Sequence, residues 1–142
     1  MSETDRTRLR RKPGRGSHER AVIESILDEA LVCHVGFVVD DAPVVIPTTF
    51  VRIDDLVYVH GAVANRMLRA IRGVETCITV TLLDALLLAR TAFHHSVNYR
   101  SVVIFGAGRV VEDPAEKRTA LAALIDKVVP RRSSACRLPD DK

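Results

Sequence analysis

Apolar residues recur at helical spacing in three segments of the chain, which are about residues 18 to 30, 63 to 72 and 113 to 129. Ser17 precedes the first segment as a candidate N-cap, and Asn65 offers a cap within the second. Asp113 and Pro114 open the third in a familiar way, because a proline in the first helical turn gives up no hydrogen bond. The pattern therefore predicts three helices.

Between these helices the chain carries β-branched and alternating apolar runs of strand length, about residues 31 to 39, 44 to 53, 56 to 59, 76 to 82 and 99 to 111. A shorter run at 86 to 89 fits either a strand or a turn. Only short turns at Asp40 to Pro43 and Asp54-Asp55 separate the first three, so they predict an antiparallel meander. Gly106 and Gly108 mark a bulge or a close backbone approach. The order of elements predicts a mainly β fold, a small closed or partly closed barrel of five to six antiparallel strands.

Composition limits the class of protein. The chain has 142 residues, 47% of them hydrophobic, which is enough for one domain with a real core. No apolar run reaches the roughly 18 to 20 residues of a membrane span, and the polar N-terminus lacks a secretory signal, so we expect a cytoplasmic protein. Cys33, Cys77 and Cys136 lie far apart, which favours neither a disulfide framework nor a zinc site; we expect the first two to be core thiols.

The net positive charge of +3 arises at the N-terminus, because the first 17 positions contain six basic and only two acidic residues. The remaining chain is nearly neutral, so nucleic acid is not the expected partner. We divide the chain into a flexible basic arm (residues 1–16), a single domain (residues 17–130) and a polar tail (residues 131–142).

The histidines do not form an obvious metal site. His94 and His95 are adjacent, so their side chains would point to opposite faces of a strand. No carboxylate stands at a spacing that completes a ligand set with them, with His34 or with His60. We therefore expect no metal ion.

The segment from Leu56 to Arg72 carries the clearest chemistry. A strand runs through Gly61 to a helix start at Asn65, with Arg66 beside it. Free N–H groups at a helix start, next to a guanidinium, suit a phosphate. The alternative is an ordinary capped amphipathic helix whose arginines face solvent.

Further polar residues interrupt apolar surroundings at Thr48 and Thr49, at His60, and from Asn98 to Ser101. Pro47 within a strand favours an edge or a bulge, where backbone groups stay free for a ligand or a second chain. Solvent-facing strand surfaces would explain the threonines equally well. Taken together, the groups fit a phosphate and a flat, polar-edged ring lying against sheet edges.

Four stretches, Ala30 to Phe37, Val45 to Thr48, His60 to Leu68 and Phe93 to Val102, resemble the FMN-binding split-barrel proteins related to pyridoxamine 5'-phosphate oxidase. The similarity is greatest to the flavin-nucleotide-binding branch that includes nitroimidazole-resistance proteins, and it covers about residues 6 to 130. It implies a six-stranded antiparallel split β-barrel and a homodimer with FMN at the subunit interface.

The cofactor-binding residues that the resemblance implies are Val45, Ile46, Pro47, Thr48, Thr49, Val59, His60, Asn65, Arg66, Arg100 and Ser101. Asn65 and Arg66 match the family's phosphate-binding Ser-Arg pair, while Arg100-Ser101 matches an Arg-Gln pair in which Ser101 is shorter. The substrate-holding basic residues of the true oxidases are absent, so that activity does not transfer.

Three functions follow from these observations. The first is an FMN-dependent oxidoreductase that passes electrons or hydride to a small organic acceptor, with His60 or His95 as a possible proton source and no obligatory catalytic side chain. The second is a non-catalytic flavin carrier. The third is a β-barrel interaction module with a basic arm. The resemblance also leaves open a deazaflavin or haem in place of FMN, and it names neither the electron donor nor the substrate.

Overall fold

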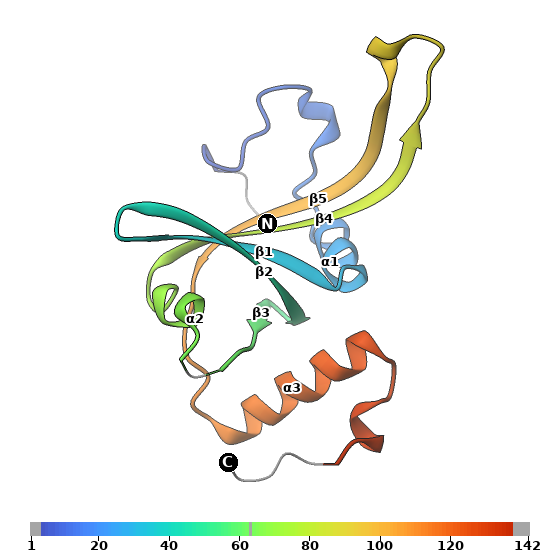
Figure 1. The fold of residues 1–142 in the computed structure, drawn as a ribbon. Helices are drawn as coiled ribbons and strands as arrows, with labels where there is room; N and C mark the ends of the chain where they lie inside the picture. Colours follow the sequence, from blue (N-terminus) through green and yellow to red (C-terminus); the bar gives the residue numbers. More distant parts are fainter. Residues whose placement is uncertain (1–3, 63, 138–142) are drawn as a thin grey trace.

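Five antiparallel strands form one sheet in the order β3-β2-β1-β4-β5 in the computed structural model, which describes residues 4–62 and 64–137 (Figure 1). The strands are β1 (Val32–Val39), β2 (Ala42–Ile53), β3 (Leu56–Val59), β4 (Glu75–Leu87) and β5 (Ser96–Ala107). The α-helices in this part of the chain are α1 (Arg20–Glu29), α2 (Arg66–Ala70) and α3 (Pro114–Val128). The mainly β, antiparallel fold predicted from the sequence is confirmed.

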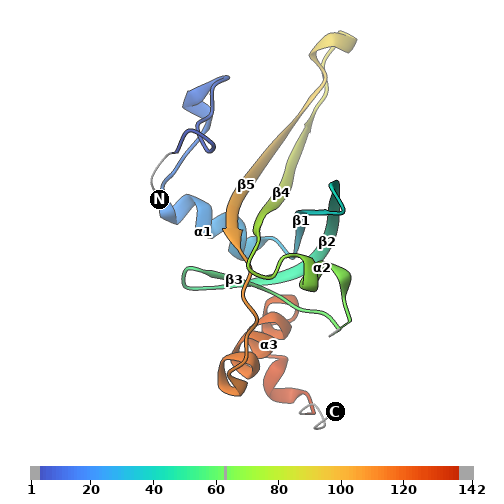
Figure 2. The ribbon, with the colours of Figure 1, turned by 90° about the vertical axis from the view of Figure 1, so that its left-hand side faces the viewer.

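The sheet differs from the prediction in its strand number and closure. The described residues give five strands rather than six, and the sheet is open, with β3 and β5 at its edges. The run at 86 to 89 is no separate strand, because the β4–β5 ladder continues past a bulge between Leu83 and Ala85 as far as the pair Leu87 and Ser96. This long hairpin projects from the body of the molecule (Figures 1 and 2).

Capping residues explain where two of the helices begin. Asn65 Oδ1 accepts the N–H of Leu68, and Asp113 accepts two N–H groups in the first turn of α3, as predicted. Ser17 is not a cap: its hydroxyl accepts the N–H of Glu19 in a turn before α1 begins at Arg20. The second helix is also shorter than predicted, with five residues, and the start predicted at residue 63 lies outside the described residues.

Gly108 confirms the predicted close backbone approach. A Cβ atom at this position would lie 2.9 Å from the carbonyl oxygen of Ile71. The Gly108 carbonyl also accepts the N–H of Gly73 at 2.8 Å. This contact ties the segment after β5 to the end of α2.

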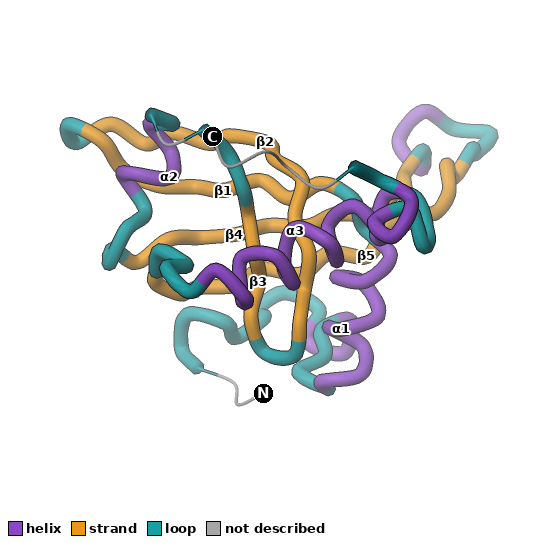
Figure 3. The backbone as a smooth tube through the Cα atoms, turned by 90° about the horizontal axis from the view of Figure 1, so that it is seen from below, coloured by secondary structure: helices purple, strands orange, loops and turns teal. Residues whose placement is uncertain are grey.

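The hydrophobic core lies on one face of the sheet, under α1 and α2; it contains Ile26, Leu27, Ala30, Cys33, Val35, Phe37, Phe50, Met67, Ile71, Val80 and Val102. Cys33 is a core thiol, and burial raises its pKa to about 11. Cys77 is only half-buried, which corrects the sequence-based expectation, because it pairs with Gly36 on the opposite face. Below the sheet, α3 packs against β2 (Figure 3).

The opposite face, which we call the outer face, is apolar but exposed. Directly paired residues of antiparallel strands share a face, so the register assigns residues to it from four strands. Its exposed apolar side chains are Val32, Val38, Val45, Leu83, Tyr99, Val103 and Phe105. None of the described helices is long and apolar enough to cross a membrane.

Candidate functional site

The predicted phosphate site is built around Arg66. The guanidinium projects from the start of α2, its side chain is 68% exposed, and it lies 3.8 Å from the Asp40 carboxylate. Asn65 caps this helix start, because its Oδ1 accepts the Leu68 N–H. A five-residue helix has only a small dipole, so the charge available to an anion comes mainly from the arginine side chain.

The neighbouring part of β2 has a free edge. Strand β3 pairs only with Phe50 to Ile53, so residues 42 to 49 have no partner strand on that side within the described sheet. Pro47, which pairs with His34 of β1, lies in this stretch. The prediction that Pro47 marks a sheet edge is confirmed, and the backbone there remains available to a ligand.

The five predicted residues of β2 divide between the two faces of the sheet. Val45, Pro47 and Thr49 lie on the outer face, opposite Gly36, His34 and Val32 respectively. Ile46 and Thr48 pair with the buried residues Val35 and Cys33 and therefore lie on the core face. Val59, from β3, packs against the core cluster.

Ser101 and Arg100 lie on β5, with β4 and β1 between them and β2. Ser101 shares the outer face through its pair Thr81. The Arg100 guanidinium instead bonds the carboxylates of Asp84 and Glu29, and these ion pairs lower the pKa of both acids. A single chain thus does not bring these two residues to the Arg66 region, and their role in cofactor binding stays a prediction.

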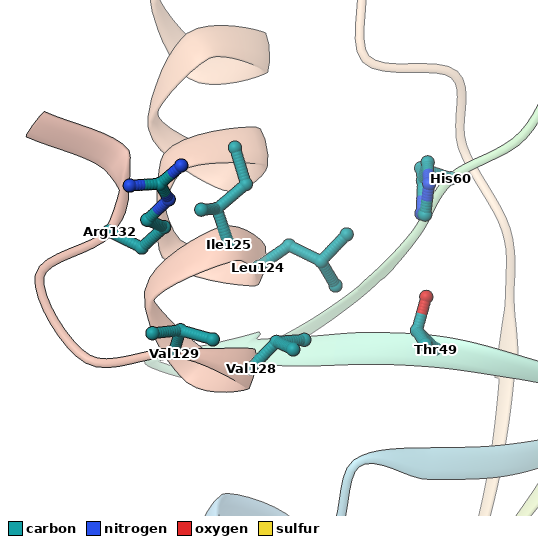
Figure 4. A pocket seen from close by; sticks show the side chains of 7 residues that line it. All are labelled: Thr49, His60, Leu124, Ile125, Val128, Val129 and Arg132. Atoms are coloured by element: carbon teal, nitrogen blue, oxygen red, sulfur yellow. The ribbon is translucent and has the colours of Figure 1, made fainter. Parts of the chain in front are cut away.

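A hollow of about 330 Å³ separates the end of β3 from α3 (Figure 4). It is lined by Thr49, His60, Leu124, Ile125, Val128, Val129 and Arg132. Two of the predicted residues, Thr49 and His60, meet here. The contribution of α3 and Arg132 was not predicted, although apolar residues at helical spacing before Pro130 gave a signal for one side of it.

The segment after α3 is held close to the helix. Asp126 accepts hydrogen bonds from the backbone N–H and the hydroxyl of Ser133, each at 2.7 Å. These bonds lower the pKa of Asp126. They also fix the turn that carries Arg132 beside the hollow.

A second hollow, of about 310 Å³, opens on the outer face, and Gly36, Val45, Cys77 and Phe105 are among the residues that line it. The N-terminal arm reaches its rim: the Arg6 guanidinium pairs with Glu75 and lies 5.0 Å from the centre of the Phe105 ring. Part of the basic arm therefore packs against the sheet.

The two histidines considered as proton sources lie in different regions. His60 faces the hollow beside α3. His95 lies in the connection between β4 and β5, directly before β5, where its Nδ1 is 3.1 Å from the carbonyl oxygen of Thr91. Only His60 lies close to other predicted cofactor-binding residues in the single chain.

The fold and site define a small antiparallel β protein with a basic group beside a free strand edge and an imidazole in an apolar hollow. The sequence matches the family model described as pyridoxamine 5'-phosphate oxidase over residues 19–142, and the chain belongs to this family. A comparison with curated protein sequences gave no match.

Solved structures with the same fold include flavoproteins. The flavocytochrome Anf3 from Azotobacter vinelandii is 33% identical, with a TM-score of 0.88, and the match covers 97% of this chain and 64% of that one. The FAD and haem binding protein from Mycobacterium smegmatis is 35% identical, with a TM-score of 0.81 and coverage of 88% and 61%. A candidate 5-nitroimidazole antibiotic resistance protein from Bacteroides thetaiotaomicron is 28% identical, with a TM-score of 0.64 and coverage of 78% and 67%.

This chain therefore spans less than two thirds of the length of the first two proteins. The resemblance to the pyridoxamine 5'-phosphate oxidase family, including a nitroimidazole-resistance-like protein, is confirmed.

Proposed function

We propose that this protein binds a flavin and uses it to transfer electrons or hydride to a small organic acceptor. The observation that carries the proposal is the exposed Arg66 guanidinium at a capped helix start beside the free edge of β2, in a chain similar to two flavin proteins over most of its length. The flavin would supply the redox chemistry, and the protein would supply position and electrostatics.

Arg66 would bind the phosphate on the flavin's ribityl chain through charge-assisted hydrogen bonds. The free edge of β2 at Val45 to Thr49 would offer backbone groups to the edge of the ring. FMN and FAD share this phosphate, so the same residues serve either flavin. FMN is the cofactor that the sequence motifs imply, whereas the names of two similar proteins include FAD or a flavocytochrome.

We also propose that the protein is a homodimer whose subunits meet through the outer face. Exposed apolar patches that extend over several strands are typical of interaction surfaces. Val45 is 62% exposed and Tyr99 is 60% exposed, although both belong to regular strands. Packing a second copy here would bury these side chains and would place the β2 edge, and hence the flavin, next to the interface.

A second candidate function, flavin-to-haem electron transfer, is favoured by one specific observation. Two similar proteins, matched over 97% and 88% of this chain, are named for a haem or cytochrome as well as a flavin. We therefore include haem among the cofactors to be tested.

The first experiment is the absorption spectrum of the purified protein, followed by chromatography of the cofactor released by heat. A flavin band supports the proposal, and the released compound distinguishes FMN from FAD. A protein that is colourless and takes up neither flavin would contradict it and would favour the interaction module.

Arg66→Ala tests the assigned phosphate site. Loss of a charge-assisted hydrogen bond is expected to weaken flavin binding by about 1.5 to 3 kcal/mol. Arg72→Ala is a matched control, because Arg72 is also an exposed arginine but lies beyond the end of α2. Equal affinity in wild type and Arg66→Ala, measured by fluorescence titration, would place the phosphate elsewhere.

Anaerobic addition of NADH or NADPH separates an enzyme from a carrier. Bleaching of the flavin band, followed by repeated turnover with an added acceptor, is expected for an oxidoreductase. A flavin that binds tightly but is reduced by neither nucleotide would favour the carrier.

A further inference from the structure

We propose that the N-terminal arm is a removable cover on the outer face, and that it competes with a second copy of the chain for the same apolar surface. The inference rests on the proposed dimer and assigns to this chain a control over its assembly. The arm would favour the monomer and would have to leave the sheet before two outer faces can meet.

A turn near the beginning of the arm presents Arg6 to the sheet. The Thr7 N–H donates a hydrogen bond to the Thr4 carbonyl at 3.1 Å, and the Thr4 N–H donates one to the Thr7 hydroxyl at 2.8 Å. Arg6 lies inside this turn, so its side chain is directed by a local structure that the arm forms by itself. Figure 1 shows the arm on the side of the sheet away from α3.

Arg6 contacts two residues of the outer face. Its guanidinium pairs with Glu75 at the start of β4, and its Cζ lies 5.0 Å from the centre of the Phe105 ring. Both partners belong to this face, because Phe105 pairs with Cys77 and Glu75 precedes Cys77 by two strand positions. Arg6 also helps to line the hollow that contains Val45. The arm therefore occupies surface that the proposed dimer would bury.

The ion pair is suited to water and not to an apolar interface. The Arg6 and Glu75 side chains are 56% and 61% exposed, so both charges stay hydrated in the single chain. A second copy packed over Phe105 would enclose them, and the lost hydration of a buried ion pair can exceed the attraction between its charges. We therefore expect dimer formation to displace the arm instead of enclosing it.

The arm is held in a way that allows it to leave. An exposed ion pair and a cation–π contact at the surface each contribute little to stability in water. Among the described residues, none of the arm belongs to the hydrophobic core cluster, and α1 begins only at Arg20. A symmetric dimer would displace two arms, so a small effect for each arm counts twice.

Arg6→Ala in the full chain tests the competition. Analytical ultracentrifugation is expected to show a dimer dissociation constant about tenfold lower than that of wild type, from roughly threefold for each of the two arms. Arg11→Ala is the matched control: it removes the same charge from the same arm, but Arg11 does not line the hollow. General repulsion between copies falls equally in both variants, so only Arg6→Ala should produce the full change.

Glu75→Gln separates the arm contact from general charge effects. This change makes the chain more positive, so repulsion between copies alone would weaken the dimer. Weaker attachment of Arg6 predicts the opposite, a tighter dimer. A dimer that is weaker in Glu75→Gln than in wild type would contradict the cover.

Labelling of Cys77 tests the cover in the monomer. Cys77 is half-buried and lines the hollow with Arg6, whereas Cys33 is fully buried. Cys136 is replaced by serine in all samples, and a neutral maleimide is used at protein concentrations where the chain is monomeric. We expect labelling to be about twofold or more faster in Arg6→Ala than in Arg11→Ala, because the thiol becomes more accessible.

Equal dimer dissociation constants in Arg6→Ala and Arg11→Ala, or equal labelling rates in the two variants, would overturn the proposal. Variants that remain monomeric at every concentration would overturn it together with the dimer. The flavin band is read in the same samples and decides the flavin function separately: a protein that binds flavin but shows none of these differences loses the cover alone.

Discussion

Both faces of the sheet carry apolar side chains, but the two faces differ in what covers them. On the core face, Val35, Phe50 and Val80 are almost completely buried beneath helices. On the outer face, Val45 and Leu83 occupy equally regular strand positions and remain more than 60% exposed. The same residue types therefore have opposite surroundings within one sheet.

This difference shows that the strands are apolar for two reasons. The apolar side chains of the core face stabilise the folded single chain, because α1 and α2 cover them and remove them from water. The outer face gains less from folding of the single chain, because its side chains stay largely exposed, and in our proposal they stabilise the dimer instead. Mutations on the two faces should consequently affect different equilibria.

Phe50→Ala is expected to have the largest effect, on the folding of the single chain. Phe50 is 1% exposed, and its ring lies 3.7 Å from the Lys127 amino group. Removing a buried phenyl ring leaves a cavity and should lower the free energy of unfolding by about 3 to 5 kcal/mol. Chemical denaturation followed by circular dichroism measures this change.

Phe105→Ala is the matched control on the outer face. Its ring is 37% exposed, so the same truncation should cost less than half as much in unfolding free energy at protein concentrations where the chain is monomeric. Equal losses for the two phenylalanines would show that the faces do not differ as described.

The sequence predicts the difference between the faces only in part. Alternation in residues 76 to 82 assigns side chains to two faces, but it does not say which one a helix or a second chain covers. Cys77 shows the limit: its residue type favours burial, whereas its register opposite Gly36 places it on the outer face. Local signals were more reliable, since Asn65 and Asp113 are the caps that their side chains predict.

The candidate site was predicted to a similar extent. Arg66 and Pro47 have local signatures, a helix start and a proline in a strand, and both lie where these signatures place them. The hollow around His60 depends on how α3 packs across the sheet, which periodicity does not encode. Arg100 matches a family motif, yet its surroundings depend on Asp84 and Glu29, whose proximity is determined by tertiary structure.

Val103→Asp is expected to act on association instead of folding. Val103 is exposed in the single chain, so an aspartate there remains hydrated, but it would lose its hydration in a dimer packed through the outer face. We expect the dimer dissociation constant to rise by roughly 100-fold, on the order of 2.7 kcal/mol. Analytical ultracentrifugation would show a shift toward the 15.7 kDa monomer.

Val110→Asp controls for added charge, because Val110 is comparably exposed but lies beyond the end of β5. Dissociation by this variant to the same degree, or none in Val103→Asp, would rule out the outer face as the dimer interface.

Lys127→Met tests a polar contact at the edge of the core face. The Lys127 ammonium donates a hydrogen bond to the Leu27 carbonyl at 2.7 Å, near the end of α1 where that carbonyl lacks a helical partner. Burial partly desolvates the ammonium group and lowers the pKa of this lysine. Methionine keeps the hydrocarbon stem, so loss of the bond and of the contact with the Phe50 ring should cost about 1 to 2 kcal/mol of unfolding free energy. Unchanged stability would mean that desolvation of the ammonium offsets both contacts.

Arg100→Leu should produce the smallest effect, visible mainly as a change in pH dependence. The guanidinium links the β4–β5 hairpin to α1 at the border of the core face, because it bonds both Asp84 and Glu29. Hydrogen bonds from Arg100 lower the pKa of both carboxyls in the folded state. The stability that they contribute is therefore present above their ordinary pKa values, 3.8 and 4.5, and is lost as the pH falls through the lower folded values.

Thermal unfolding of wild type and Arg100→Leu between about pH 6 and pH 3 measures this contribution. We expect the wild-type Tm to fall more steeply with acidification than the Tm of the variant, because leucine removes the cause of the lowered pKa values. The groups are solvent-exposed, so the difference should be modest and should shrink in high salt. Parallel pH profiles would show that these ion pairs do not help to hold the hairpin against α1. Apolar contacts alone would then join the hairpin to α1 at the border of the core face.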